Sequence, residues 1–160
     1  MDLREPANRV SPRARAYWAV ESGIGWVVLI VVQVVLLVVL DARPWWQWGL
    51  LALTVVLALV GLLLVPAWRY RVHRWEVSPT AVYTQRGWVT QERRIAPITR
   101  VQTVDTERGP LAQLFKLSTV TVTTASSEGA LKIECLDQDV ASRLVQDLTV
   151  VTDRTEDDAT

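Results

Sequence analysis

The chain has 160 residues, half of them hydrophobic, and its 17 basic and 17 acidic side chains give a formal net charge of zero. A single cysteine excludes an internal disulfide and a multi-cysteine metal site. The sequence has no glycine-rich phosphate loop, HExxH zinc motif or GxSxG nucleophile elbow. We therefore predict no catalytic residue, no cofactor and no metal.

Residues 1–19 form a basic segment that we expect to be a cytoplasmic tail. It resembles the charged start of a secretory leader, but the apolar run that follows exceeds the usual length of about 7–15 residues. No small-x-small cleavage site follows either, so cleavage is disfavoured. The arginines of this segment are Arg4, Arg9, Arg13 and Arg15.

Two apolar runs, Ser22–Leu40 and Gly49–Val65, follow one another with only Asp41–Trp48 between them. At about 1.5 Å per residue, the first run of about 19 residues covers about 28 Å, close to the hydrocarbon thickness of a bilayer. Buried strands of about 4–8 residues are much shorter. The sequence therefore predicts a two-helix transmembrane hairpin over residues 20–66.

Basic residues predict the orientation of this hairpin. Arg69, Arg71 and Arg74 follow the second run, whereas the short loop has only Arg43 beside Asp41. The positive-inside rule then predicts a multi-pass protein of the plasma membrane with both termini in the cytoplasm. Aromatic residues fit this arrangement, with Tyr17, Trp18, Trp68 and Tyr70 expected at the inner interface and Trp45, Trp46 and Trp48 at the outer one.

Three residues inside the hairpin are candidates for helix packing. Gly25 and Gly61 lie about five residues inside the cytoplasmic ends of their runs, where small residues allow close approach of two backbones. Glycine is also common in membrane helices without such a role. Gln33 either bonds to the other helix or to another protomer, or is simply tolerated. Because no ionisable residue lies inside the runs, we expect an anchor and not a pore.

Residues 67–150 have the texture of a small soluble domain of antiparallel strands. Leu117–Ala125 alternates valine with threonine, which predicts a strand with one buried face. A helix with an apolar stripe should begin after Asp137 and pack across the sheet, and residues 151–160 should be an acidic, disordered tail. The six expected strands are Arg74–Ser78, Ala81–Arg86, Trp88–Ile95, Ile98–Thr106, Leu117–Ala125 and Leu131–Glu134.

Three segments of this domain carry a resemblance: residues 97–104 (PITRVQTV), residues 109–117 (GPLAQLFKL) and residues 119–122 (TVTV). They resemble the bacterial pleckstrin-homology-like (PH-like) domains of membrane-flanked proteins, in their short two-span form. The resemblance implies a bent antiparallel sheet of about seven strands capped by a C-terminal helix, one strand more than the pattern shows. Lys116 and Cys135 stand where the family commonly has glycine, so a positive φ there would strain the backbone.

The charges are unevenly spread along the chain. Between residues 69 and 100 there are seven arginines but only two acidic residues, Glu76 and Glu92. We predict that these arginines contact an anionic membrane surface. The alternative is a solvated strand face on which arginines keep an edge soluble. His73, beside the membrane, is expected to be an interfacial polar residue. The seven arginines are Arg69, Arg71, Arg74, Arg86, Arg93, Arg94 and Arg100.

Three classes of function follow. The first is a non-catalytic scaffold at the inner face of the membrane that binds a membrane protein. The resemblance implies that this partner is a larger protein with related domains, and the alternative partner is a second copy of the chain in a homo-oligomer. The second is a sensor of anionic lipid headgroups, although the uncharged loop Ser78–Thr80 disfavours phosphoinositide recognition of the kind that the eukaryotic relatives perform. An enzyme has no support in the residues. Nucleic acid and a small-molecule substrate are not expected as partners.

Overall fold

The structure, a computed structural model, describes residues 5–39, 44–87, 90–125 and 129–157, and for residues 152–157 it describes the backbone alone. Arg43 in the expected hairpin loop and the start of the strand expected at Trp88 lie outside this part of the chain. The last three residues of the expected tail also lie outside it.

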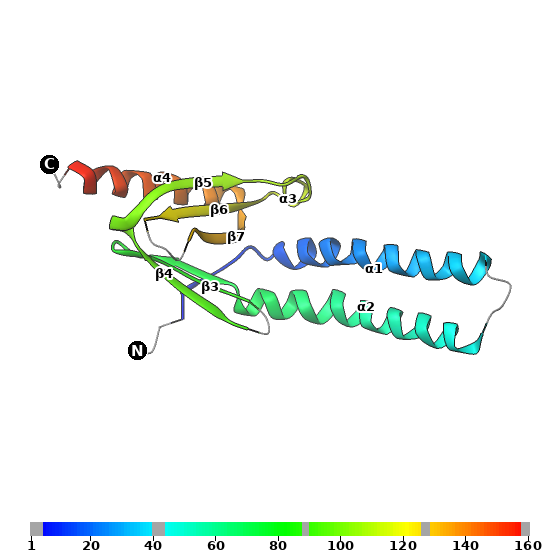
Figure 1. Ribbon diagram of the computed structural model, residues 1–160. Helices are drawn as coiled ribbons and strands as arrows, with labels where there is room; N and C mark the ends of the chain where they lie inside the picture. The colour runs from blue at the N-terminus through cyan, green and yellow to red at the C-terminus, as the bar shows by residue number, and fades with distance from the viewer. Residues whose placement is uncertain (1–4, 40–43, 88–89, 126–128, 158–160) are drawn as a thin grey trace.

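Two long helices leave the rest of the molecule side by side as an antiparallel hairpin (Figure 1): α1 (Ala14–Val39) and α2 (Trp45–Val72). Their most apolar stretches have a mean hydropathy of 2.7 and 2.8, and most side chains there are exposed, so both are long and apolar enough to cross a membrane. Both extend past the apolar runs at the domain end. In particular, α2 continues through Pro66, where the hairpin was expected to end. Proline is tolerated inside membrane helices, because neighbouring groups satisfy the backbone carbonyl that it leaves unpaired.

The contacts between α1 and α2 use two of the three candidate packing residues. Gln33 donates from Nε2 to Thr54 Oγ1 at 2.9 Å, and Thr54 donates in turn to the Leu50 carbonyl at 2.9 Å. A Cβ on Gly61 would lie 3.0 Å from the indole nitrogen of Trp26, whereas a Cβ on Gly25 would meet nothing within 4 Å. Gly61 therefore lies at the contact between the helices, and Gly25 does not. Gly23, which would meet Leu62 at 3.3 Å, is the close-packed glycine of α1.

We predict that Gly61→Ile destabilises the hairpin while Gly25→Ile does not. Extra methyl groups at residue 61 must displace the Trp26 ring, and overpacking of this kind costs about 1–3 kcal/mol. Thermal unfolding of the full chain in detergent, followed by helix content, measures the difference. Equal effects of the two variants would contradict the observed packing.

In the described part of the chain, seven strands form two antiparallel sheets at one end of the hairpin (Figure 1), so the PH-like fold and its strand number are confirmed. One sheet has the order β1-β2-β3-β4 and the other the order β5-β6-β7. The 3-10 turn η1 (Ile98–Arg100) connects β4 to β5, and the short helix α3 (Pro110–Leu114) connects β5 to β6. The strands are β1 (Asn8–Arg9), β2 (Arg74–Val77), β3 (Ala81–Arg86), β4 (Glu92–Pro97), β5 (Val101–Glu107), β6 (Leu117–Thr124) and β7 (Leu131–Asp137).

The strand that the sequence pattern lacks is β1, which comes from the N-terminal segment and precedes the hairpin. Asn8 pairs with Trp75 and Arg9 with Arg74 of β2. A two-residue strand carries no alternation of apolar and polar residues, so its sequence gives no sign of it. Residues 8–9 thus belong to a sheet of the domain and not to a tail.

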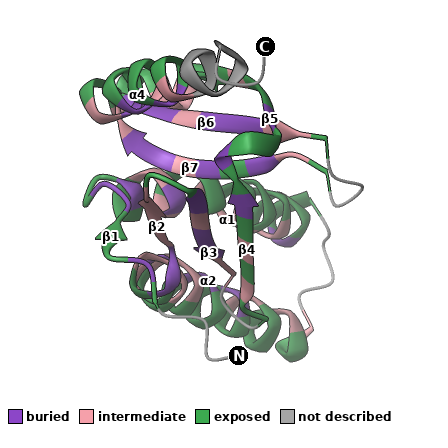
Figure 2. Cartoon of the chain, turned by 90° about the vertical axis from the view of Figure 1, so that its left-hand side faces the viewer, coloured by how far each residue is buried: buried purple, intermediate pink, exposed green. Residues whose placement is uncertain are grey.

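The main core lies between the two sheets and the C-terminal helix α4 (Gln138–Asp157). Figure 2 shows buried residues in purple along β3, β6 and β7. Ala141, Leu144 and Leu148 of α4 are at most 5% exposed, which agrees with the predicted stripe. The helix continues seven residues beyond the expected boundary at 150, because Val151 extends the stripe and packs against the same core.

A second, smaller core joins the hairpin to the domain. Ala14 and Trp18 of α1 pack with Val10 against Leu117 and Cys135 of the three-stranded sheet. This junction core covers the face of β6 that was expected to meet solvent. Strand β6 is therefore buried on both faces near its start, and the prediction of one buried face is wrong there.

The two positions that the resemblance singles out do have left-handed backbones: φ is 55° at Lys116 and 57° at Cys135. Lys116 follows α3, and its amide donates to the Gln113 carbonyl at 3.0 Å. A side chain in this conformation costs about 1–2 kcal/mol, which glycine avoids. Lys116 in the turn after α3 and Cys135 within β7 thus both have a strained backbone.

We predict that Lys116→Gly stabilises the chain by about 0.5–1 kcal/mol, because relief of strain exceeds the added chain entropy of about 0.5–1 kcal/mol. The Lys116 side chain is exposed, so little packing is lost. Lys116→Ala, which keeps the strain, is the matched control. Thermal unfolding in the same detergent tests this, and an equal gain from both variants would exclude backbone strain as the cause.

Candidate functional site

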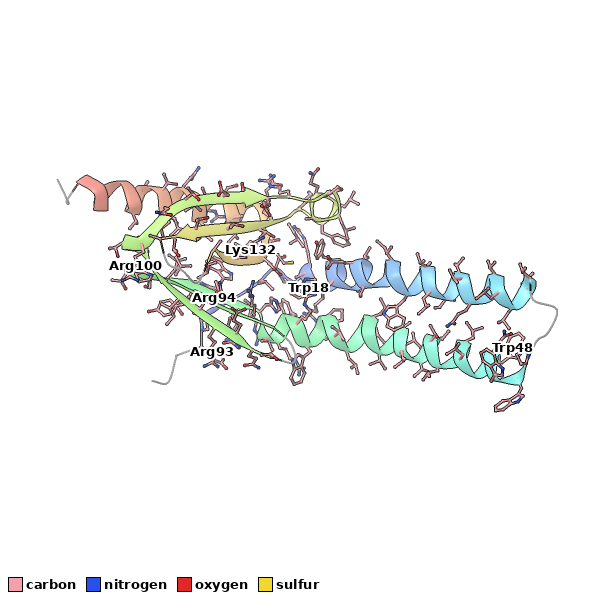
Figure 3. All side chains as sticks on the ribbon, viewed as in Figure 1. Trp18, Trp48, Arg93, Arg94, Arg100 and Lys132 are labelled. Atoms are coloured by element: carbon pink, nitrogen blue, oxygen red, sulfur yellow. The ribbon has the colours of Figure 1, made fainter. Side chains whose placement is uncertain are left out.

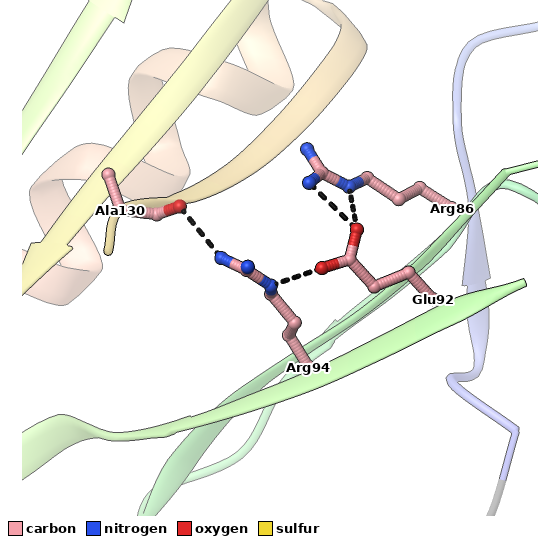
Figure 4. A network of polar contacts seen from close by, with 4 residues as sticks. All are labelled: Arg86, Glu92, Arg94 and Ala130. Atoms are coloured by element: carbon pink, nitrogen blue, oxygen red, sulfur yellow. Dashed lines mark hydrogen bonds and ion pairs between the residues drawn. The ribbon is translucent and has the colours of Figure 1, made fainter. Parts of the chain in front are cut away.

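Glu92 lies at the centre of a polar network between β3 and β4 (Figure 4). Its Oε2 accepts from Arg86 Nε at 2.9 Å and pairs with Arg86 Nη2 at 2.8 Å, and its Oε1 accepts from Arg94 Nε at 2.6 Å. The hydrogen bonds from Arg86, and then those from Arg94, lower the pKa of the Glu92 carboxyl. Arg94 also donates to the Ala130 carbonyl at 3.3 Å, which links the two sheets.

This network changes the role of the arginines that were predicted to contact lipid. Arg86 and Arg94 both pair with the partly exposed carboxylate of Glu92. Arg100 lies at the end of the domain that is farthest from Trp48 and the hairpin tip, while Arg93 is exposed on β4 (Figure 3). The structure therefore does not bring these four arginines together into one membrane-facing patch.

The other three arginines lie where the hairpin meets the domain. The guanidinium of Arg69 stacks over the Trp18 ring with its carbon 4.4 Å from the ring centre. Arg74 pairs with Glu5 at 3.6 Å, and Arg71 is exposed at the end of α2. These three positions are the ones nearest to a membrane surface at the end of the hairpin.

A pocket of about 380 Å³ opens at this junction, between the domain ends of the helices and strands β6 and β7. Its charges are mixed: Glu21 and Glu134 lie across from Arg69 and Lys132, and Glu134 lies 3.9 Å from Arg69. The hydroxyl of Ser118, which also lines the pocket, is buried and has no hydrogen-bond partner among the described residues. A mixed lining of this kind has no strong preference for anions.

A smaller pocket of about 220 Å³ lies at the opposite end of the domain. Arg94 and Arg100 contribute its two positive charges, beside Ile95 and Leu131. Because Arg94 is bound to Glu92 and Ala130, only part of this charge is available to a ligand.

The described residues offer little for catalysis. Burial raises the pKa of the Cys135 thiol to about 12, so the sulfur is protonated and a weak nucleophile at neutral pH. Within the described ranges no group of three or more His, Cys, Asp or Glu side chains is placed to hold a metal ion.

The sequence of the chain matches a known family and a curated relative. The family model described as "Bacterial PH domain" matches residues 22–149, most of the chain. The chain belongs to the bacterial PH domain family. The match starts after β1, so it includes Leu117 and Cys135 of the junction core but not Val10, Ala14 and Trp18.

A curated relative covers almost the whole of this bacterial PH domain protein. The UPF0699 transmembrane protein YdbS of Bacillus subtilis strain 168 is 32% identical over 157 residues, which are 96% of this chain and 98% of that protein. No solved structure is significantly similar to the chain. With two apolar helices and a transmembrane relative, this is a membrane-associated bacterial PH-like domain protein.

The junction of this bacterial PH domain is the feature that the residue pattern misses. Trp18, expected at the lipid interface, is only 3% exposed and packs inside the protein, with its ring 5.0 Å from that of His73. Ser11 donates its hydroxyl to Asp137 at 2.8 Å and its amide to the Cys135 carbonyl at 2.9 Å. The resemblance implied a seventh strand, but the pattern of residues 67–150 showed only six. That missing strand was the only sign that residues before the hairpin belong to the domain.

His73 is part of this buried junction and not an exposed interfacial residue. It is 5% exposed, and its Nδ1 lies 2.8 Å from the Arg69 carbonyl, so Nδ1 carries the proton that it donates. Burial lowers the pKa of the imidazole. The folded protein therefore favours the neutral ring.

We predict that the chain loses stability as the pH falls below about 6.5, the usual histidine pKa, because the unfolded chain then binds a proton that folded His73 resists. The slope from this one group is at most about 1.4 kcal/mol per pH unit. His73→Asn keeps a donor to the Arg69 carbonyl and should flatten the dependence between pH 7.5 and about 5.5. Thermal unfolding across that range measures it, and parallel curves would show that another group titrates.

Proposed function

We propose that this protein is a non-catalytic, membrane-anchored interaction module at the inner face of the bacterial plasma membrane. Its partner is a membrane protein that carries related domains, or a second copy of this chain. The observation that carries the proposal is the open edge of the three-stranded sheet at β5.

Strand β5 offers a backbone edge for pairing. It is the first strand in the order β5-β6-β7, and within the described part of the chain no strand pairs with its outer side. Five of its seven residues are exposed, including Thr103 and Asp105. Such an edge is suited to an added strand, in which backbone hydrogen bonds supply affinity and side chains supply specificity.

The arrangement of charges supports a protein partner over specific recognition of anionic lipid. Arg86 and Arg94 are already bound to Glu92, and Arg100 lies far from the hairpin. The arginines beside α2 still provide a general attraction to an anionic leaflet. That attraction helps to hold the domain at the surface without selecting a headgroup.

The orientation belongs to the same proposal. The arginines before α1 and at the end of α2 favour an orientation with both termini and the domain in the cytoplasm and with Trp45, Trp46 and Trp48 at the outer interface. In this position the β5 edge faces other proteins of the inner membrane surface, and the protein has no enzymatic role.

The test is photo-crosslinking in intact bacterial membranes, with a photoreactive amino acid at Thr103 on β5. The matched control position is Gln146, which is exposed on α4. We expect adducts from residue 103, but not from residue 146, that contain a second copy or a membrane protein with related domains. Adducts that form equally at both positions, or only with lipid, would contradict the proposal.

A second variant separates the protein partner from the lipid surface. Arg71→Ala with Arg93→Ala removes two exposed charges outside the Glu92 network. Since screening extends over only about 8 Å at physiological salt, lipid-driven contacts should weaken in this variant and at high salt. We expect the yield of the residue 103 adduct to stay unchanged. A collapse of the yield would favour the lipid sensor.

A further inference from the structure

Helix α3 presents an exposed apolar side chain at the end of the domain that faces the hairpin. Among the described residues after α2, the large apolar side chains that are exposed are Ile95, Leu114 and Val150. Leu114, the last residue of α3, is 80% exposed, against 41% and 49% for the other two. In Figure 1, α3 lies beyond the end of β5 and beside the first turns of α1.

The position of α3 along the hairpin is fixed by packing. Ala112 and Phe115 pack against the junction core, and the Phe115 ring meets the Tyr17 ring edge-on at 6.2 Å. Two faces of the short helix thus differ, because Ala112 and Phe115 pack against the junction core while Leu114 is exposed.

The depth of Tyr17 on α1 gives the depth of α3 relative to the bilayer. Tyr17 precedes the apolar run that starts at Ser22 by five residues, or about 7 Å along a helix. The headgroup layer on each side of the hydrocarbon is about 5–8 Å thick. The level of Tyr17, and with it that of α3, is therefore the level of the lipid headgroups.

We propose that α3 docks on the inner leaflet of the protein's own membrane, with Leu114 inserted among the headgroups and upper acyl chains. The flanking residues fit this position, because Arg108 and Lys116 are exposed and would lie beside lipid phosphates. The domain then has a third point of membrane contact beside the two helices. This inference does not depend on the proposed protein partner.

The test uses the full chain in nanodiscs of phosphatidylcholine and phosphatidylglycerol, with one chain per disc. Nitroxide labels are placed through Leu114→Cys and, as the matched control at the far end of the domain, Val150→Cys. Cys135 stays in place, since burial keeps its thiol protonated, and the unmodified chain shows the background. The measurement is the ratio of collision rates with oxygen and with a water-soluble nickel chelate.

We expect this ratio to be several-fold higher at residue 114 than at residue 150, because oxygen concentrates in lipid and the chelate does not. Equal ratios at the two positions would overturn the proposal. A high ratio at residue 114 that appears only in discs with several chains would also overturn the proposal, since Leu114 would then lie at a contact between copies.

A second set of variants tests the role of the Leu114 side chain itself. A label at Gln113, which is exposed on α3, serves as the reporter in this arm. Leu114→Asp should lower the ratio at residue 113 to its value in solution, whereas Val150→Asp should leave it unchanged. If the ratio at residue 113 stays high in Leu114→Asp, Leu114 does not anchor α3 and the proposal fails.

Discussion

The hydrogen bond from the Ser11 amide to the Cys135 carbonyl joins the chain just before the first apolar helix to the last strand of the domain. The Ser11 hydroxyl and Arg13 add contacts to Asp137, and Trp18 fills the space behind them. These contacts make the hairpin and the domain one packed body. The orientation of every surface of the domain, including the β5 edge and α3, follows from them.

Rigid attachment changes how the charges of the domain should be interpreted. A domain on a flexible linker can turn its basic face to the lipid, and the number of arginines then predicts its membrane contact. Here the position of each arginine is fixed, and Arg86 and Arg94 act within the fold, where they join β3, β4 and the start of β7 through Glu92 and Ala130. Membrane contact depends on which residues lie near the hairpin and less on the total charge.

The parts that could be predicted from sequence are those with a long, regular pattern. The hairpin followed from the length of two apolar runs, and the stripe of Leu144 and Leu148 identified α4. The parts that could not be predicted depend on contacts between distant residues. Arg9 pairs with Arg74 across the whole length of the hairpin in sequence. Glu92 meets its two arginines only when β3 and β4 are paired. The position of Gly25 along the apolar run does not tell which side of the helix it lies on.

The pairing of β1 with β2 has a topological consequence. Arg9 and Arg74 are neighbours in an antiparallel pair, so the two strands and everything between them form a β-hairpin whose connecting loop is the pair of long apolar helices. The membrane anchor is thus an insertion at one turn of a sheet. An ordinary turn in its place could keep the strand order, but it would also remove Ala14 and Trp18 from the junction core, so a soluble form of this domain would need other residues to cover Leu117 and Cys135.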